Sequence, residues 1–173
     1  MATLNPNFTT VPACTRTSKS KSWLFLWSAV GLILQLTSGQ SLCLEFSPYG
    51  NPLAQLLLGD KLVMAEVVAS PEKLYLGLSH RDRLPEGHGM LFVMPKREYQ
   101  HFCMRGMRFP IDIIWLASDR VVGVTADLAP SEPGVFSSPE PVSLVLEVPG
   151  GWCRRHNVKT NTPVTLPDLP IFP

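Results

Sequence analysis

Two charged side chains lie in segments that otherwise consist mostly of glycine, proline and apolar residues. Arg81 ends the stretch Gly-Leu-Ser-His-Arg, and Asp112 lies in the stretch Pro-Ile-Asp-Ile-Ile-Trp. A guanidinium can grip an anion through paired hydrogen bonds, and a carboxylate can orient the ligand. Such a ligand site would comprise Arg81, Arg105 and Asp112. The simpler interpretation is structural: Arg81 and Asp112 form an ion pair, or a corner bonded to backbone groups that links two loops, because a buried charge needs a partner. Arg105 and Glu147 are alternative partners.

Catalytic groups are weaker candidates. Asp112 and Glu147 could supply a pair of carboxylates for hydrolysis, and Cys103 could be a thiol activated by His101. Two residues on one face of a strand rarely form a hydrogen-bonded dyad, however, and no serine has the G-x-S-x-G context of a nucleophile. A small extracytoplasmic hydrolase or redox enzyme therefore remains the alternative to a non-catalytic protein.

Histidine and cysteine form no known metal motif in this chain. The four candidates His80, His88, His101 and Cys103 lack C-x-x-C and H-E-x-x-H spacing, and we expect neither a metal nor another cofactor. In an oxidising compartment we predict a disulfide between Cys103 and Cys153, because Cys43 falls in an expected linker. The alternative is that these cysteines are small, unpaired buried residues.

The N-terminal residues have the layout of an export signal. Basic residues precede the apolar residues 23–34, and small polar residues follow. A membrane-spanning helix needs about 20 apolar residues, whereas this run breaks at Gln35. We therefore expect residues 1–41 to be an export signal cut near residues 39–42. The protein would then be periplasmic or secreted, and the alternative is a membrane anchor over residues 23–36.

The charge of the chain argues against a nucleic-acid partner. The 173 residues contain 15 Lys and Arg against 14 Asp and Glu, a net charge of +1. Three of the basic residues would leave with the signal, so the remaining 12 would face 14 acids and the mature domain would be slightly acidic. Neither form has the basic surface that binding to nucleic acid requires.

Short strands separated by turns account for most of the remaining chain. The expected strands are residues 61–68, 90–94, 97–104, 111–117, 121–126, 143–148 and 162–166. Ser70, Pro71 and Glu72 predict the start of a short helix that ends by Gly77, and a second short helix is expected after residue 151. These elements predict a mostly β chain, a single antiparallel β-sandwich or jelly-roll-like barrel with one or two short helices. Residues 42–60 are expected to form a linker, 61–166 the domain and 167–173 a Pro-rich tail.

Five motifs in this order resemble a known family. They are L-G-L-S-H-R (76–81), L-P-E-G-H-G-M-L-F (84–92), H-F-C-M-R-G-M (101–107), P-I-D-I-I-W (110–115) and V-L-E-V-P-G-G (145–151). Over residues 61–166 the chain is similar to the domain of unknown function 192 (DUF192) family, although Cys103 stands at the position of the family's usual Trp. The resemblance implies a compact β-sandwich of jelly-roll type, frequently behind an export signal. It implies no established reaction.

We therefore expect a non-catalytic binding or accessory module of the cell envelope. Its partner would be a small ligand or an envelope protein, and it would touch a membrane only through an uncleaved N-terminal segment. The Pro-rich loop over residues 128–141 is long enough to present an interaction surface to such a protein.

Overall fold

The computed structural model of the protein describes residues 45–130 and 132–166. The expected export signal, the alternative anchor, Cys43 and the Pro-rich tail lie outside the described residues. In chain order the elements are β1 (Leu53–Leu58), β2 (Lys61–Val68), α1 (Pro71–Leu76), β3 (His88–Glu98), β4 (His101–Phe102), β5 (Ile111–Leu116), β6 (Val121–Leu128), β7 (Phe136–Ser137), β8 (Val142–Pro149), α2 (Trp152–Arg155) and β9 (Val164–Thr165). In the described part of the chain, no helix is long and apolar enough to cross a membrane.

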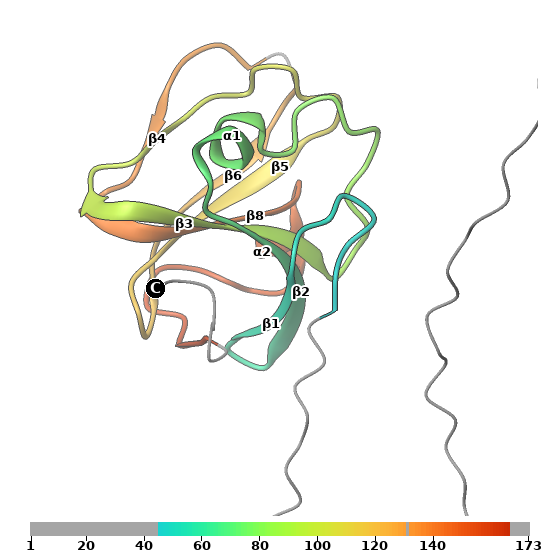
Figure 1. The fold of residues 1–173 in the computed structure, drawn as a ribbon. Coiled ribbons are helices and arrows are strands. Elements are labelled where there is room, and N and C mark those ends of the chain that lie inside the picture. Colours follow the sequence, from blue (N-terminus) through green and yellow to red (C-terminus); the bar gives the residue numbers. More distant parts are fainter. Residues whose placement is uncertain (1–44, 131, 167–173) are drawn as a thin grey trace, which may run out of the picture. The chain divides into compact units, whose positions relative to one another are not determined.

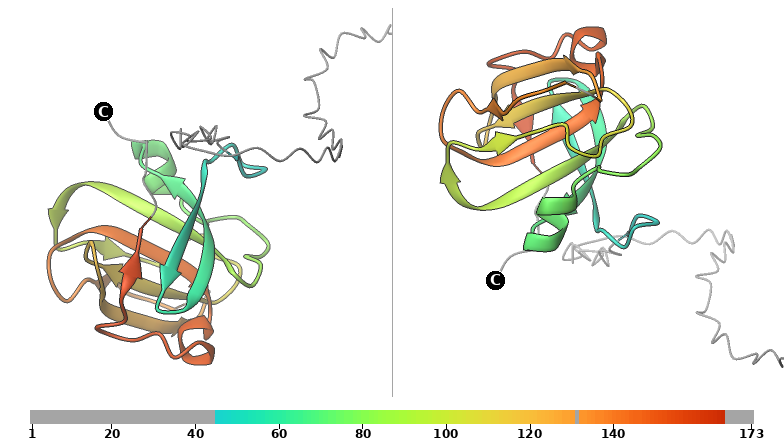
Figure 2. Two further views of the ribbon diagram at one scale, coloured as in Figure 1. Left: turned by 90° about the horizontal axis from the view of Figure 1, so that it is seen from below. Right: turned by 90° about the horizontal axis from the view of Figure 1, so that it is seen from above.

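Seven strands form one curled sheet in the order β6-β5-β8-β3-β2-β1-β9, and β4 pairs with β7 in a small second sheet (Figure 1). The curl gives the large sheet the form of a half-barrel, visible from two further directions in Figure 2. Backbone hydrogen bonds between residues 119–121 and 161–164 join its two ends. The prediction of a mostly β chain with two short helices is confirmed, whereas a sandwich or jelly roll is not.

One strand pairing departs from the antiparallel prediction. β2 and β3 run parallel, with Met64 beside His88 and Val68 beside Phe92. Parallel neighbours need a crossover connection, and α1 lies in the segment that supplies it. This helix begins as the sequence predicts: the Ser70 side chain accepts a hydrogen bond from the Lys73 backbone, and Pro71 opens the first turn. It ends at Gly77, whose φ of 51° is one that glycine adopts without strain.

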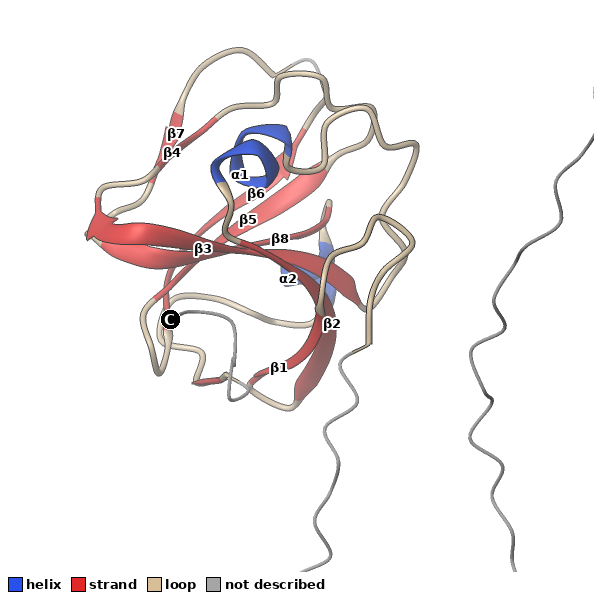
Figure 3. Ribbon diagram, in the orientation of Figure 1, coloured by secondary structure: helices blue, strands red, loops and turns tan. Residues whose placement is uncertain are grey.

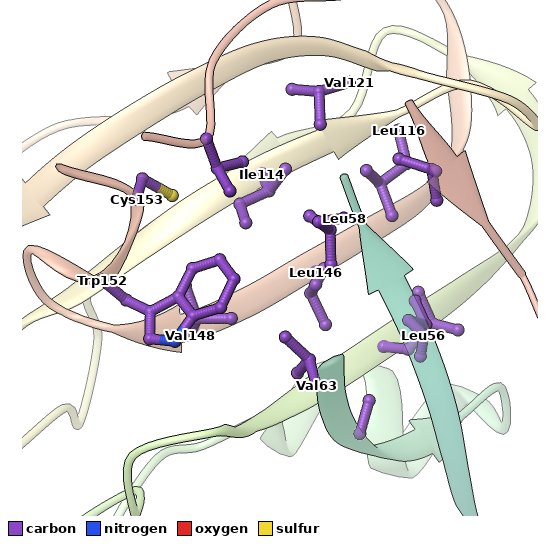
Figure 4. Close-up of a cluster of buried hydrophobic side chains, with 14 of the residues drawn as sticks. Leu56, Leu58, Val63, Ile114, Leu116, Val121, Leu146, Val148, Trp152 and Cys153 are labelled. Carbon is purple, nitrogen blue, oxygen red and sulfur yellow. The ribbon is translucent and has the colours of Figure 1, made fainter. Parts of the chain in front are cut away.

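The central strands are covered on both faces, which explains their almost unbroken apolar sequences. All six residues of β5 are buried. We call the cluster on the concave side the inner core; it is closed at one end by Trp152 and Cys153 of α2 and is drawn in Figure 4. We call the cluster on the convex side the outer core; it lies under α1 and the small sheet (Figure 3). Phe102 of β4 is fixed there by edge-to-face contacts with Phe92 and Trp115, at 5.0 and 5.7 Å between ring centroids.

Three boundaries differ from the sequence prediction. The linker expected over residues 42–60 contains β1, which pairs with β2 along its whole length and buries Leu56 and Leu58 in the inner core. The strand expected over residues 97–104 is divided between the end of β3 and the short β4. The loop expected over residues 128–141 contains β7, which pairs with β4.

Candidate functional site

Asp112 has a structural role in this fold. Its fully buried carboxylate accepts hydrogen bonds from the backbone N–H groups of Asp127 (2.7 Å), Gly151 (2.8 Å) and Cys153 (2.8 Å). These contacts tie β5 to the end of β6 and to the first turn of α2. Both carboxylate oxygens are thereby engaged, so the expected contact between Asp112 and Arg81 does not form.

Arg81 pairs instead with Glu66 of β2. Its two terminal nitrogens donate to the two carboxylate oxygens of Glu66 at 2.5 and 3.0 Å, and both side chains are largely buried. Ser47 and Asn51 also donate to this carboxylate, at 2.9 and 2.7 Å. The Tyr49 ring covers the guanidinium at 3.7 Å. Arg81 therefore forms a structural ion pair, as the simpler interpretation of the sequence predicts, but its partner is Glu66 rather than Asp112.

The ionised state of Glu66 is stabilised by these contacts. Burial acts to raise the pKa of Glu66, but the hydrogen bonds from Arg81, Asn51 and Ser47 and the charge of Arg81 outweigh it, so the pKa lies below its usual value. The carboxylate is charged at neutral pH and neutralises the guanidinium.

Glu147 of β8 is the contrasting case. It lies in register between Met90 of β3 and Ile113 of β5, on the same convex face of the sheet as Glu66. Its side chain is buried, and its Oε2 atom has no hydrogen-bond partner among the described residues. Burial raises the pKa of Glu147 to about 8, a rise that the charge of Arg81 only partly opposes. At neutral pH Glu147 is therefore a neutral carboxyl that can donate as well as accept a hydrogen bond.

Glu147 contributes to the wall of a pocket between α1 and the convex face of the sheet. This pocket, which we call the helix pocket, has a volume of about 240 Å³. Apolar side chains line it: Leu74, Leu76, Leu78, Phe92, Met94, Phe102 and Met107. Its exposed polar residues, which form the mouth together with the exposed Leu76, are Tyr75, His101, Cys103 and Arg105. The pocket combines an apolar body with one buried acid at its inner end.

Arg105 is held at the rim of this mouth. Its guanidinium donates to the Tyr75 hydroxyl at 2.8 Å and to the Tyr75 backbone carbonyl at 3.3 Å, and it stacks on the Tyr75 ring at 4.0 Å. The Ser79 hydroxyl donates to the Arg105 carbonyl at 2.9 Å. Arg81 lines a separate pocket of about 350 Å³ on the other side of residues 76–79. The structure thus brings Arg105 and Glu147 to one pocket and leaves Arg81 and Asp112 outside it.

The cysteine prediction is wrong in this structure. Cys103 is exposed at the mouth of the helix pocket, whereas Cys153 is buried in the inner core on the other side of the sheet, and both are free thiols. Burial and the nearby Asp112 carboxylate raise the pKa of Cys153. The histidine candidates are also dispersed: among the described residues, no group of three or more His, Cys, Asp or Glu could hold a metal.

The sequence does not predict the roles of two acids in this region. Glu66 is the partner of Arg81, and Glu147 is a buried neutral carboxyl rather than an ion-pair or catalytic residue. Each interrupts an otherwise apolar strand, in K-L-V-M-A-E-V-V and S-L-V-L-E-V. An acid at such a position must find a donor or stay neutral, and that was the available signal.

Comparison with known proteins gives the family. A sequence model of DUF192, described as an uncharacterised ACR, matches residues 55–166. The chain belongs to the DUF192 family. No curated protein matches its sequence significantly.

Two solved structures share the DUF192 fold seen here. One is a protein of unknown function from Novosphingobium aromaticivorans, with 24% identity and a TM-score of 0.67, covering 72% of this chain and 94% of that one. The other, from Sinorhizobium meliloti, is described as a candidate transcription regulator, with 23% identity and a TM-score of 0.61, covering 66% and 92%. At these identities the likeness supports the fold alone.

Removal of the Arg81 side chain will destabilise this DUF192 domain strongly. Arg81→Ala leaves the Glu66 carboxylate buried without its counter-charge, for which we expect a loss of about 3–5 kcal/mol in the free energy of unfolding. Arg108→Ala is the matched control, because its ion pair with Asp82 is exposed and should contribute less than about 1 kcal/mol. Urea unfolding followed by circular dichroism measures both, and equal losses would contradict a structural role for Arg81.

The protonation of Glu147 will appear in the pH dependence of stability. The folded protein holds a proton on Glu147 up to a pKa of about 8, whereas the unfolded chain releases it near 4.5. Glu147 therefore makes the free energy of unfolding decrease as the pH rises between these values, by about 1.4 kcal/mol per pH unit at most. Glu147→Gln keeps a neutral side chain and lacks this decrease.

The measurement is urea unfolding of wild type and Glu147→Gln at several pH values across that window. Subtracting one profile from the other removes the contributions of the other titrating groups. Glu98→Gln, at an exposed position of β3, is the control and should give a profile parallel to wild type. A parallel profile for Glu147→Gln would show that Glu147 is ionised in the folded protein.

Proposed function

We propose that this protein is a non-catalytic binding module of the cell envelope that holds a small molecule in the helix pocket. The observation that carries the proposal is that the pocket is lined by the buried acid Glu147, whose Oε2 atom has no hydrogen-bond partner among the described residues. A buried polar atom without a partner costs about 1–3 kcal/mol. A ligand that forms a hydrogen bond with Glu147 would remove this cost.

The rest of the pocket supports a small organic ligand. Its walls are apolar, and its few polar groups converge from the inner end and the mouth, as in most small-molecule sites. The volume of about 240 Å³ is below the roughly 300–1,000 Å³ of pockets for drug-sized ligands. The ligand would therefore be a compact molecule.

The geometry gives less support to the hydrolase or redox alternative. Asp112 and Glu147 do not form an acid–base pair: Glu147 lies beside Ile113, and Asp112, its neighbour in β5, points to the opposite face of the sheet. The Nδ1 atom of His101 forms a hydrogen bond of 2.8 Å with Ser137, so that this ring nitrogen is already engaged rather than directed to Cys103. Both arrangements favour binding over catalysis.

The envelope location rests on the sequence of the N-terminal residues. A basic flank, the apolar run over residues 23–34 and the small polar residues after it favour export to the periplasm or outside. A small ligand is the partner that the helix pocket supports, and an envelope protein that contacts residues 128–141 is the alternative partner.

Small organic molecules will bind in the helix pocket. With methionine methyl groups labelled with ¹³C, we expect a fragment set of anions, cations and neutral molecules to shift the NMR signals of Met94 and Met107, which line the pocket. Met64, half-buried in β2 outside it, should not shift. Met94→Trp should abolish the response of Met107 by filling the pocket, whereas Met64→Trp should preserve it. No response to any fragment at millimolar concentration would contradict the proposed function.

Export will remove the N-terminal signal and leave a shorter chain of defined mass. Intact mass spectrometry of the protein purified from its own host should give a chain that begins between residues 40 and 43, because a signal peptidase cuts after the small polar residues. The full-length mass in the membrane fraction would instead indicate an anchor over residues 23–36. The full-length mass in the soluble cytoplasmic fraction would contradict the envelope location.

A further inference from the structure

The two ends of the helix pocket differ in charge. Arg105 at the mouth carries a positive charge, and within the described residues it forms no ion pair with a carboxylate. Its contacts with Tyr75 use two of the five N–H donors of the guanidinium and fix its position. The remaining donors can bind an anionic group that enters the mouth, in the paired geometry that guanidinium groups favour.

The inner end of the pocket presents a neutral acid. Arg81 is the cation that acts on Glu147, but both of its terminal nitrogens are already bonded to Glu66. No described donor reaches the Oε2 atom of Glu147. Because a buried carboxylate without a donor or a counter-charge is strongly disfavoured, Glu147 carries its proton and offers an O–H group to whatever fills the pocket.

The other titratable groups around the pocket lie at its rim or behind its wall. Those that line this pocket or the neighbouring one are Tyr49, Lys73, Tyr75, His80, Arg81, Asp82, His101, Cys103 and Arg105, and Glu66 is bonded to Arg81. Glu66 is neutralised by Arg81, and Asp82 pairs with Arg108. Among the described residues that line the helix pocket, Glu147 is the one carboxyl, so no carboxylate at the mouth would attract a cationic ligand. The aromatic rings of Phe92 and Phe102 and the side chains of Met94 and Met107 form an apolar wall between the two ends. Such a wall suits a flat apolar body.

We propose, resting on the function proposed above, that the ligand is a small organic anion with an apolar body. Its anionic group pairs with Arg105 at the mouth, and an oxygen at its inner end accepts a hydrogen bond from the Glu147 carboxyl. Binding is then linked to a proton on the protein, and affinity decreases as the pH rises and Glu147 loses that proton. A cationic ligand would behave in the opposite way. It would be repelled by Arg105 and would need Glu147 to be ionised, so its affinity would increase with pH.

Three matched probes separate these possibilities. 4-Methoxyphenylacetate has a carboxylate at one end and an ether oxygen, which does not titrate, at the other. 4-Ethylphenylacetate has the same shape without the ether oxygen. 2-(4-Methoxyphenyl)ethylamine replaces the carboxylate by an amine. Dissociation constants come from NMR titrations of the Met94 and Met107 methyl groups at about pH 6 and about pH 9, one unit above the pKa of about 8 for Glu147.

We expect the methoxy anion to bind more tightly than the ethyl anion at about pH 6, and to lose about tenfold in affinity at about pH 9. Glu147→Gln should still bind the methoxy anion, because its amide donates to the ether oxygen, but with an affinity that no longer depends on pH. Arg105→Gln should weaken both anions about tenfold and should not weaken the amine, because the variant removes a like charge from the mouth. Arg83→Gln, at an exposed position outside the pocket, is the control and should leave all three unchanged.

Three results would overturn the proposal while the proposed function stands. They are tighter binding of the amine with an affinity that rises with pH, equal binding of the methoxy and ethyl anions, and a pH dependence that persists in Glu147→Gln. That last result would show that a group other than Glu147 causes the pH dependence. If no probe and no other fragment shifts Met94 or Met107, the proposed function itself fails, and this proposal with it. Thermal unfolding of each variant excludes loss of binding through misfolding.

Discussion

The central strands β3, β8 and β5 lie between two apolar layers, and this constraint determines what a polar residue on the sheet can do. A side chain that points toward either face leaves water, so an acid there must be given donors, paired with a cation or kept neutral. The sheet has one example of each. Asp112 accepts three backbone N–H bonds, Glu66 pairs with Arg81, and Glu147 is kept neutral by its burial.

The burial of charged groups on this sheet also connects the ion pair of Arg81 with the shape of the helix pocket. Its ion pair with Glu66 fixes the end of the segment that follows α1, where Leu78 is buried in the outer core and the His80 backbone donates to the carbonyl of Gly106. Residues 76–79 of that segment separate the helix pocket from the pocket beside Arg81. Arg81 therefore acts on the helix pocket as a positioning residue: it holds the wall without lining the cavity. Asp112 has the equivalent role on the concave side, where it fixes the start of α2 and so closes the inner core.

The features that the sequence predicts correctly are those with local causes. Ser70, Pro71 and Gly77 specify the ends of α1 within a few residues of one another, and the apolar runs of β5 and β8 need only their own composition to be recognised. The sequence does not predict β1, because Pro, Gly and Asn precede it and its three consecutive leucines do not alternate with polar residues. Its strand character comes from pairing with β2 and β9. The predictions of the Arg81 partner and of the Cys103–Cys153 disulfide are wrong for the same reason, because each depends on which face of the sheet distant segments cover.

The identity of residue 147 carries the strongest argument that this pocket does more than complete the core. A leucine or methionine at this place would pack against Met90 and Ile113 with no polar atom to satisfy. A glutamine would offer a donor and an acceptor in the same space without any charge. Glutamate provides what neither of them can, a donor that exists only while a proton is bound. In the exported, ligand-binding protein proposed above, such a group would couple what the pocket holds to the acidity of its surroundings.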